Sequence, residues 1–262
     1  MKREAPRLSF LILTEDSAAD ACEPIEALLK RMLLFVDPAV QTHRIKFEPR
    51  DEAARSAMRG TNWKAKPDDF GHPKLVLLGR IIAAKLLEEA DAPGFVLFHI
   101  DGDTLWADRA SSDNVQKFPG FVRDYVAQGL DAALRKRRDK PLDEEALAAA
   151  KEAALARLLR LTPFWCIEAW LYQNTALVHR LCEERCGAHL DEIKRWSEDR
   201  GALDEVPTPK KAICLGSQHN AVLARSHFPA EAVFAADKSY AAAVMSLVEC
   251  ADLCAALAHT WA

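Results

Sequence analysis

The stretch Leu8–Thr14, with the sequence LSFLILT, decides the fold class, and the acids Glu15 and Asp16 follow it directly. An almost purely apolar run of this length that ends in acids is typical of a strand covered on both faces. A second such run, Phe95–Ile100, is followed by Asp101-Gly102-Asp103. Strands buried on both faces belong to parallel sheets that lie between layers of helices. The chain is therefore expected to fold as an α/β protein.

Helical and strand patterns alternate around these two runs. Further strands are expected at Thr42–Phe47 and Leu158–Pro163. Amphipathic spacing predicts helices from Ser17 as N-cap to about Val36, over Leu75–Leu86, over Phe121–Arg138, over Asp143–Ala156, from Ile167 to about Cys186, and over most of residues 193–262. This alternation predicts a mostly parallel sheet flanked by helices over residues 1–175, with residues 176–262 as a helical C-terminal extension packed on it.

Composition narrows the class of protein. The chain has 262 residues, of which 50% are hydrophobic, and a formal net charge of −4. This charge argues against a protein that coats DNA without sequence preference, because such proteins are usually basic overall, although local basic patches remain compatible with it. The sequence contains no GxxxxGK[ST], GxGxxG or GxSxG motif, so nothing in it indicates that the chain alone binds ATP or a dinucleotide.

The expected compartment follows from the absence of export signals and from the cysteines. No apolar run approaches the ~20 residues that a membrane span needs, and the first apolar stretch has no small-residue cleavage site after it. Seven cysteines are scattered along the chain, which indicates reduced thiols rather than a disulfide framework. We therefore expect a soluble, cytoplasmic protein without a membrane partner.

Acidic residues follow both buried strands. Glu15 comes after the first strand, and Asp101 and Asp103 come after the later one. If these strands are neighbours, the three carboxylates converge, and their repulsion must be relieved by protonation, a basic side chain or a cation. Oxygen ligands suit Mg²⁺ or Mn²⁺, and Gly102 would let the loop turn sharply so that both aspartates face one ion. The alternative is that each acid merely ends a strand or caps a helix.

Three short motifs, LILTED, LFHIDGD and PFWCIEAWL, resemble the Toprim domain and its bacterial relatives. In Toprim domains a Glu follows the first strand and a DxD follows the third. The EAWL segment resembles Toprim-like bacterial proteins of uncharacterised function, which are related to the nucleases of overcoming-lysogenization-defect (OLD) proteins and of phage-defence systems. The resemblance extends over residues 7–175, with a further match in the C-terminal TPKK and ADKSY. It implies a Toprim/Rossmann-like fold.

The resemblance also implies roles for individual residues in a Mg²⁺-dependent phosphoryl-transfer site. Glu15 would be an acid/base or a metal ligand, Asp101 and Asp103 metal ligands, and Glu168 an additional acid, although Glu168 could instead anchor a helix beginning at Ile167. A basic group would bind the phosphate, and the candidates are Lys210, Lys211 and Lys238, which could equally be solvated surface lysines. The chain departs from many Toprim enzymes in having Asp16-Ser17 where they have a Gly.

The function expected from these features is Mg²⁺- or Mn²⁺-dependent hydrolysis of phosphodiester bonds in DNA or RNA. The resemblance implies a component of a bacterial phage-defence or nucleic-acid-processing system with an ATPase partner. The alternative is a non-catalytic Toprim or receiver-like module that binds a metal and a partner protein. Metal-dependent cleavage of nucleic acid distinguishes the two, since only the first requires it.

Two basic stretches could contact a nucleic-acid backbone. One is the loop between Glu48 and Pro73, which is expected to contain at most one helical turn. The other is the run from Arg135 to Lys140. The residues singled out for nucleic-acid contact are Arg50, Arg55, Lys64, Arg135 and Arg137, with Trp63 available to stack on a base. The alternative for the second run is a solvated helix end, because cations favour a helix C-terminus.

Histidines and cysteines at two places in the chain could either form a functional site or pack in the core. His179, Cys182, Cys186 and His189 have spacings that a helical zinc site could use. Free cysteines commonly behave as small buried apolar residues, so we predict that this set binds no zinc. His99, next to the DxD, is a candidate catalytic base or, as the favoured interpretation, a hydrogen-bonded core histidine.

Overall fold

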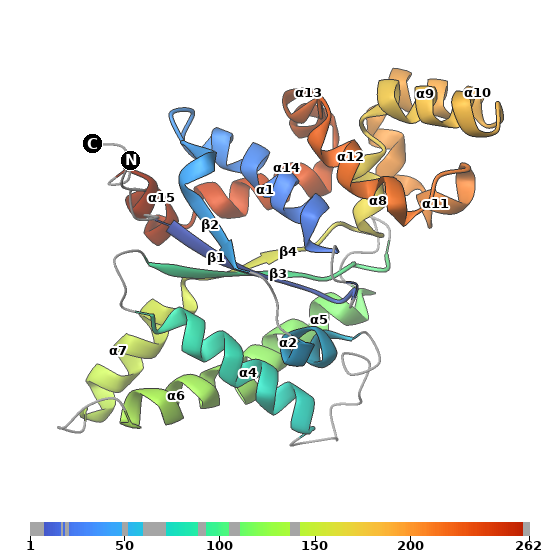
Figure 1. Cartoon of the computed structure of the whole chain (residues 1–262). Helices are drawn as coiled ribbons and strands as arrows, with labels where there is room; N and C mark the ends of the chain where they lie inside the picture. The colour runs from blue at the N-terminus through green and yellow to red at the C-terminus, as the bar shows by residue number, and fades with distance from the viewer. Residues whose placement is uncertain are drawn as a thin grey trace.

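A computed structural model describes residues 8–16, 18, 21–48, 52–59, 72–88, 93–104, 111–136 and 142–258, without the side chains of Lys210 and Lys211. Its centre is one sheet of four parallel strands in the order β2-β1-β3-β4 (Figure 1). The strands are β1 (Leu8–Thr14), β2 (Ile45–Glu48), β3 (Gly94–His99) and β4 (Leu158–Leu161). Every residue of β1 and β3 is buried, as the apolar runs predicted. The predicted α/β class with a parallel sheet flanked by helices is confirmed.

Helices from the middle of the chain cover one face of the sheet (Figure 1). They are α2 (Glu52–Met58), α4 (Pro73–Leu86), α5 (Asp113–Phe121), the π-helical turn η3 (Val122–Val126), α6 (Ala127–Lys136) and α7 (Glu144–Leu155). Their apolar sides form a cluster with side chains of alternate residues in β1 and β3, such as Leu13 and Phe98. Successive side chains of a strand point to opposite faces, so the remaining residues of β1 and β3 face the other layer.

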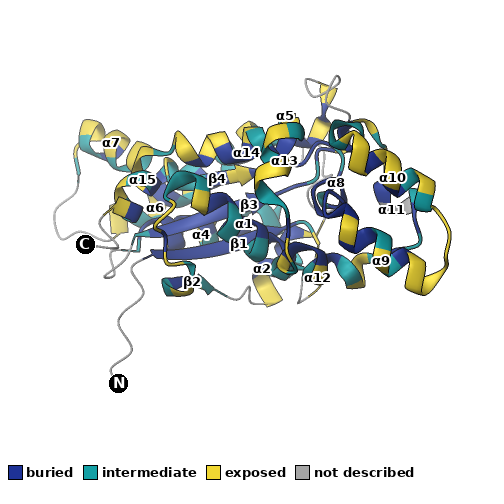
Figure 2. Ribbon diagram, turned by 90° about the horizontal axis from the view of Figure 1, so that it is seen from above, coloured by how far each residue is buried: buried dark blue, intermediate teal, exposed yellow. Residues whose placement is uncertain are grey.

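The other face is covered by α1 (Cys22–Val36) together with helices from the C-terminal part of the chain (Figure 1). The helices beyond β4 are α8 (Ile167–Leu171), α9 (Thr175–Arg185), α10 (Leu190–Glu198), α11 (Pro209–Ala212), α12 (Asn220–Arg225), α13 (Ala230–Ala236), α14 (Lys238–Val248) and α15 (Ala251–Ala258). α1 packs against α12 and α14. Figure 2 shows the buried strands between helices whose outer sides are exposed. A domain boundary after residue 175 stays a prediction.

Three elements begin or end at residues other than those predicted. α1 begins at Cys22 after Ala21, which provides no side-chain cap, whereas the predicted cap Ser17 lies outside the described residues. Thr42–Arg44 forms a 3-10 turn, so β2 starts later than expected. β3 is shifted one residue toward the N-terminus, from the expected Phe95–Ile100 to Gly94–His99.

Other boundaries differ as well. β4 ends at Leu161, two residues before the proline that lacks an N–H for the ladder. The basic loop contains the seven-residue helix α2 rather than a single turn. The helix α5 was not predicted. Few of its residues are apolar, and Pro119 stands inside the helix that the N-cap residue Ser112 begins.

Cysteine pairing departs from the expectation of reduced thiols. Cys186 and Cys214, 28 residues apart, form a disulfide, while the other five cysteines are free. Their spacing gave no hint of this, because tertiary packing brings the end of α9 close to the segment after α11. A disulfide sulfur is not a thiolate ligand, so the four residues considered for zinc do not offer four free ligands here. The prediction of no zinc stays a prediction.

The length and composition of the helices decide whether any of them could cross a membrane. Within the described part of the chain, no single helix has the length and apolar composition to cross a membrane. Lys238–Val248 and Ala251–Ala258 meet that test only as a pair, and the pair is bent by 67°.

Candidate metal centre

The carboxyl ends of β1 and β3 bring Glu15 and Asp101 into direct contact. These strands pair in register up to Thr14 and His99, so the residues that follow leave the sheet at the same edge. The backbone N–H of Asp101 donates a hydrogen bond to Oε1 of Glu15, with an N–O distance of 3.2 Å. The structure thus brings together the acids that the sequence placed after two separate strands.

The Asp101-Gly102-Asp103 loop is held against the segment after β4. The amides of Gly102, Asp103 and Thr104 donate to the carbonyls of Pro163, Trp165 and Phe164, at 2.9, 3.1 and 2.9 Å respectively. A Cβ on Gly102 would lie 2.2 Å from the Phe164 carbonyl oxygen, so glycine is needed for close approach of two backbones. The sharp turn is made by Asp103, whose φ is 50°. The turn was expected at Gly102, one residue earlier.

Glu168 is the fourth acid of the site, and α12 holds it in place. Its side chain is buried, and Nδ2 of Asn220 donates to its Oε1 at 3.2 Å. The N-terminus of α8 is anchored by a different residue, because the N–H of Ile167 donates to Oδ1 of Asp101 at 3.1 Å. Asp101, rather than Glu168, is therefore the acid that satisfies a backbone donor of this helix.

The electrostatics of the cluster are dominated by Asp101. Burial raises the pKa of the Asp101 carboxyl well above its usual range, and the charges of Glu15, Glu168 and Asp103 raise it further. The hydrogen bond from Ile167 acts in the opposite direction. Four carboxylates that repel one another, as the sequence predicted for three of them, need a proton or a cation to offset their charge.

A cavity of about 630 Å³ opens onto this cluster. Its described lining residues are Thr14, Glu15, Asp16, Ala18, Ala21, Pro24, Ile25, His99, Asp101, Asp103, Ile167, Glu168, Ser217, Gln218, Asn220 and Ala221. They include five acids and neither Lys nor Arg. Residues 217–221, which form one wall, were missed by sequence reasoning, since no periodicity or motif links Ser-Gln-His-Asn to strands more than a hundred residues earlier.

The donor set fits a hard divalent cation by its chemistry. All four acids supply carboxylate oxygens, the ligands that Mg²⁺ and Mn²⁺ prefer, and no described lining residue is a Lys or Arg that would neutralise them. One oxygen of each of the four carboxylates accepts a hydrogen bond from a backbone or side-chain amide. Within the described ranges no three His, Cys, Asp or Glu side chains are close enough to enclose an ion. The acids would therefore have to move closer together to enclose a cation.

His99 contacts both a residue of β1 and an acid of the cluster. Its Nδ1 is 3.0 Å from Oγ1 of Thr14, and its Nε2 is 3.6 Å from Oδ1 of Asp101. The ring is buried between β1 and the aspartate. The contact with Thr14 fits a core histidine, while the ring also lines the cavity, so the choice between core histidine and catalytic base stays a prediction.

The lysine candidates belong to two helices, α11 and α14. Lys210 belongs to α11, which packs against α8, and nearby Trp165 donates through Nε1 to Oγ1 of Thr208 at 3.2 Å. The side chains of Lys210 and Lys211 are outside what the structure describes. Lys238 is exposed at the start of α14 and does not line the cavity.

The predicted nucleic-acid contacts are only partly within the described residues. Arg135 is 51% exposed and pairs with Asp131 at 2.9 Å and Glu144 at 3.0 Å, at the end of α6 away from α8 (Figure 1). These ion pairs favour a solvated helix end over a nucleic-acid contact. Arg55 lies in α2 and does not line the cavity. Arg50, Lys64, Arg137 and Trp63 lie outside the described residues.

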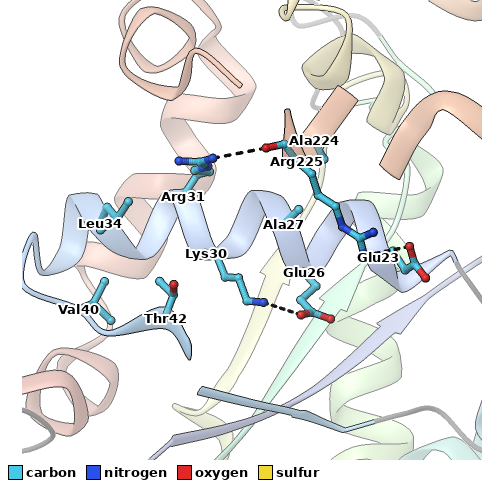
Figure 3. A pocket seen from close by; sticks show the side chains of 10 residues that line it. All are labelled: Glu23, Glu26, Ala27, Lys30, Arg31, Leu34, Val40, Thr42, Ala224 and Arg225. Atoms are coloured by element: carbon cyan, nitrogen blue, oxygen red, sulfur yellow. Dashed lines mark hydrogen bonds and ion pairs between the residues drawn. The ribbon is translucent and has the colours of Figure 1, made fainter. Parts of the chain in front are cut away.

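A second cavity, of about 460 Å³, lies between α1 and α12 (Figure 3). Four of its five charged side chains are paired with one another: Lys30 contacts Glu26 at 2.7 Å, and Arg225 contacts Glu23 at 2.9 Å. Arg31 donates to the carbonyl of Arg225 at 3.5 Å. This cavity therefore has one more base than acid among its described lining residues, in contrast to the five acids of the cavity around Asp101.

Replacing Gly102 with alanine is expected to lower the free energy of unfolding by about 1–3 kcal/mol, because the added methyl must push the Pro163–Phe164 backbone away. Urea denaturation measures the change. Gly120→Ala is the matched control: its Cβ would meet only Arg123, at 3.8 Å, and alanine is the better helix former. Equal stability of the two variants would contradict the close backbone contact.

Segments far apart in the sequence thus converge on one cavity: the ends of β1 and β3, the start of α8 and the start of α12. Three of these segments supply four acids, and the charges of Glu15, Asp103 and Glu168 raise the pKa of Asp101. Comparisons with protein-family models, with curated proteins and with solved structures give no match to the chain. The chemistry of the site is therefore inferred from its own residues.

Proposed function

We propose that the chain is a Mg²⁺- or Mn²⁺-dependent nuclease of Toprim type that hydrolyses phosphodiester bonds in DNA or RNA. The observation that carries the proposal is the convergence of Glu15, Asp101, Asp103 and Glu168 at one end of a parallel sheet. Ligands of open parallel sheets bind at that end, where the loops leave the strands. The resemblance of the segments around Glu15 and Asp101 to Toprim motifs supports the same assignment.

The four acids share two tasks in this proposal, cation binding and proton transfer. Asp101, Asp103 and Glu15 would hold the cation, which when bound neutralises charge on the phosphate oxygens and lowers the pKa of a water molecule. Glu168 faces the cluster from α8, and either it or Glu15 is placed to accept a proton. Asn220 keeps the Glu168 carboxylate directed toward the cavity through its hydrogen bond at 3.2 Å.

The acidic lining also predicts how substrate binding depends on metal. Five acids without a described Lys or Arg among them repel a polyanion. Nucleic acid should therefore bind at the cavity only when a divalent cation is present. The Lys210 side chain, carried by the helix next to α8, is the proposed additional phosphate contact.

The proposed setting is a bacterial phage-defence or nucleic-acid-processing system with an ATPase partner. This setting rests on the resemblance alone. A metal- and partner-binding module without catalysis is the alternative that the assay below distinguishes.

The test is cleavage of single-stranded and duplex DNA and RNA by the purified full-length chain, with an ATPase encoded beside its gene added where there is one. We expect cleavage in Mg²⁺ or Mn²⁺ and none in EDTA. Glu15→Gln keeps the shape of the side chain but removes its charge, so the same preparation of this variant controls for contaminating nucleases. Cleavage by Glu15→Gln at the parental rate, or none by the parent in any combination, would reject the nuclease proposal.

A further inference from the structure

We infer that Asn114 is a positioning residue that fixes Asp103 for cation binding, an inference that rests on the proposed function. Asn114 stands in the first turn of α5 and is buried. Neither it nor its helix was singled out by the sequence. It does not line the cavity, so it acts through the aspartate.

One amide group makes both contacts. Nδ2 of Asn114 donates to the carbonyl oxygen of Asp101 at 2.9 Å and to Oδ2 of Asp103 at 3.1 Å. A backbone carbonyl only accepts hydrogen bonds, so the nitrogen rather than the oxygen of the amide must face it. Both N–H bonds of the amide are thereby used on the Asp101–Asp103 loop.

Asp103 needs such support for two reasons. Its φ of 50° is a backbone conformation that residues other than glycine adopt at an energetic penalty. Its exposed carboxylate is also repelled by the neighbouring acids, which favours rotation away from them. A hydrogen bond from a buried amide opposes both effects.

The neutrality of the donor suits this task. A Lys or Arg in the place of Asn114 would hold the aspartate but would also cancel the charge that attracts a cation. An amide orients the carboxylate and leaves its charge in place. Such partners of metal ligands typically contribute 10–100-fold to metal affinity.

The neighbouring residues keep Asn114 itself in position. Ser112, the N-cap of α5, accepts a hydrogen bond from the N–H of Val115 and donates one to the carbonyl of Gly102. The start of α5 therefore holds the loop on one side, while the segment Pro163–Trp165 holds it on the other. The conformation of Asp103 therefore depends on the start of α5 and on the segment after β4, both of which lie outside the loop itself.

The test is Mn²⁺ binding to the full-length Asn114→Ala variant, measured by isothermal titration calorimetry. We expect a dissociation constant about 10–100-fold above that of the parent. Where the parent cleaves nucleic acid, the variant should also lose activity at low Mn²⁺ and recover it at saturating Mn²⁺, which a purely structural defect would not do. Asn114→Ser, which retains one donor, should give an intermediate constant and serves if the alanine variant does not fold.

Asn174→Ala is the matched control. Asn174 is also a buried asparagine whose Nδ2 donates twice, to the carbonyls of Leu223 at 3.0 Å and Ser226 at 2.8 Å, neither of which belongs to the Asp101–Asp103 loop. The substitution Asn174→Ala should lower the free energy of unfolding and leave the Mn²⁺ dissociation constant unchanged. Two results would overturn the inference while leaving the metal site intact. One is an Mn²⁺ dissociation constant within twofold of the parent in both Asn114 variants, and the other is a dissociation constant that rises as much in Asn174→Ala as in Asn114→Ala. A parent that binds no Mn²⁺ would overturn the proposed function and this inference together.

Discussion

Asp101→Ala is expected to lower the rate of metal-dependent cleavage by about 10²–10⁴-fold. The substitution removes both a proposed ligand and a charge from the centre of the cluster, where Asp101 contacts Glu15 and the N-terminus of α8. Single-turnover cleavage at saturating Mg²⁺ measures the loss. The parental rate in this variant would place the catalytic site elsewhere.

Asp101→Asn separates the electrostatic part of this effect from the structural part, since an amide oxygen can still accept the hydrogen bond from Ile167. Burial and three neighbouring acids raise the pKa of Asp101, so its contribution to folding stability is complete at low pH and falls as the pH rises through the folded-state pKa. Without metal at neutral pH, Asp101→Asn should therefore melt no lower than the parent. It should also lose the stabilisation that Mg²⁺ gives the parent.

Asp131→Ala is the control for a general effect of removing an aspartate. Asp131 pairs with Arg135 and Lys151 on the surface, and the hydrogen bond from Arg135 is the largest cause that lowers its pKa. Its removal should leave cleavage and the response to Mg²⁺ unchanged. A melting temperature of metal-free Asp101→Asn clearly below that of the parent would contradict the electrostatic picture of the cluster.

A second large effect is expected from the buried pair Asp204 and Asp237. Burial, together with the charge of Asp204, raises the pKa of Asp237 to about 7, and burial also raises the pKa of Asp204. Asp237 caps α14 by accepting from the N–H of Tyr240 at 2.7 Å, and Ser239 donates to it at 2.9 Å. Asp204 accepts from the N–H of Lys238 at 2.8 Å. Two carboxylates in this setting are best stabilised when they share a proton.

Because the folded-state pKa is raised, this stabilisation is complete below about pH 4 and is lost as the pH rises through about 7. We expect Asp237→Asn, which keeps an oxygen for the cap, to reduce the fall in unfolding free energy between pH 5 and pH 8 by roughly 2–3 kcal/mol. Urea denaturation of parent and variant at several pH values measures the difference. Parallel pH profiles would show that the pair does not share a proton.

The sequence was informative where function depends on residues next to buried strands. LSFLILT predicted β1, the run before Asp101 predicted β3, and parallel pairing then required Glu15 and Asp101 to leave the sheet at the same edge. Both inferences depend on local hydrophobicity and on a general property of parallel sheets. The contact between Glu15 and Asp101 further required β1 and β3 to be neighbours, which the sequence analysis assumed and the sheet order shows.

The other parts of the site depend on contacts between distant segments. Asn114 belongs to α5, whose short apolar pattern is interrupted by Pro119 and Gly120, and Asn220 reaches Glu168 from a part of the chain that was expected only to be helical. The disulfide between Cys186 and Cys214 has the same origin in tertiary packing. Gly102 was identified correctly as special, but the reason is the close approach of the Phe164 backbone.

The most direct test of the central claim is the anomalous scattering of Mn²⁺ in crystals of the full-length chain. The account predicts a peak at the carboxyl ends of β1 and β3, about 2.0–2.6 Å from carboxylate oxygens of Asp101 and of Asp103 or Glu15, and its loss in Asp101→Ala. A parent crystal at saturating Mn²⁺ with no peak there, or with a peak only at a site remote from these acids, would contradict the account.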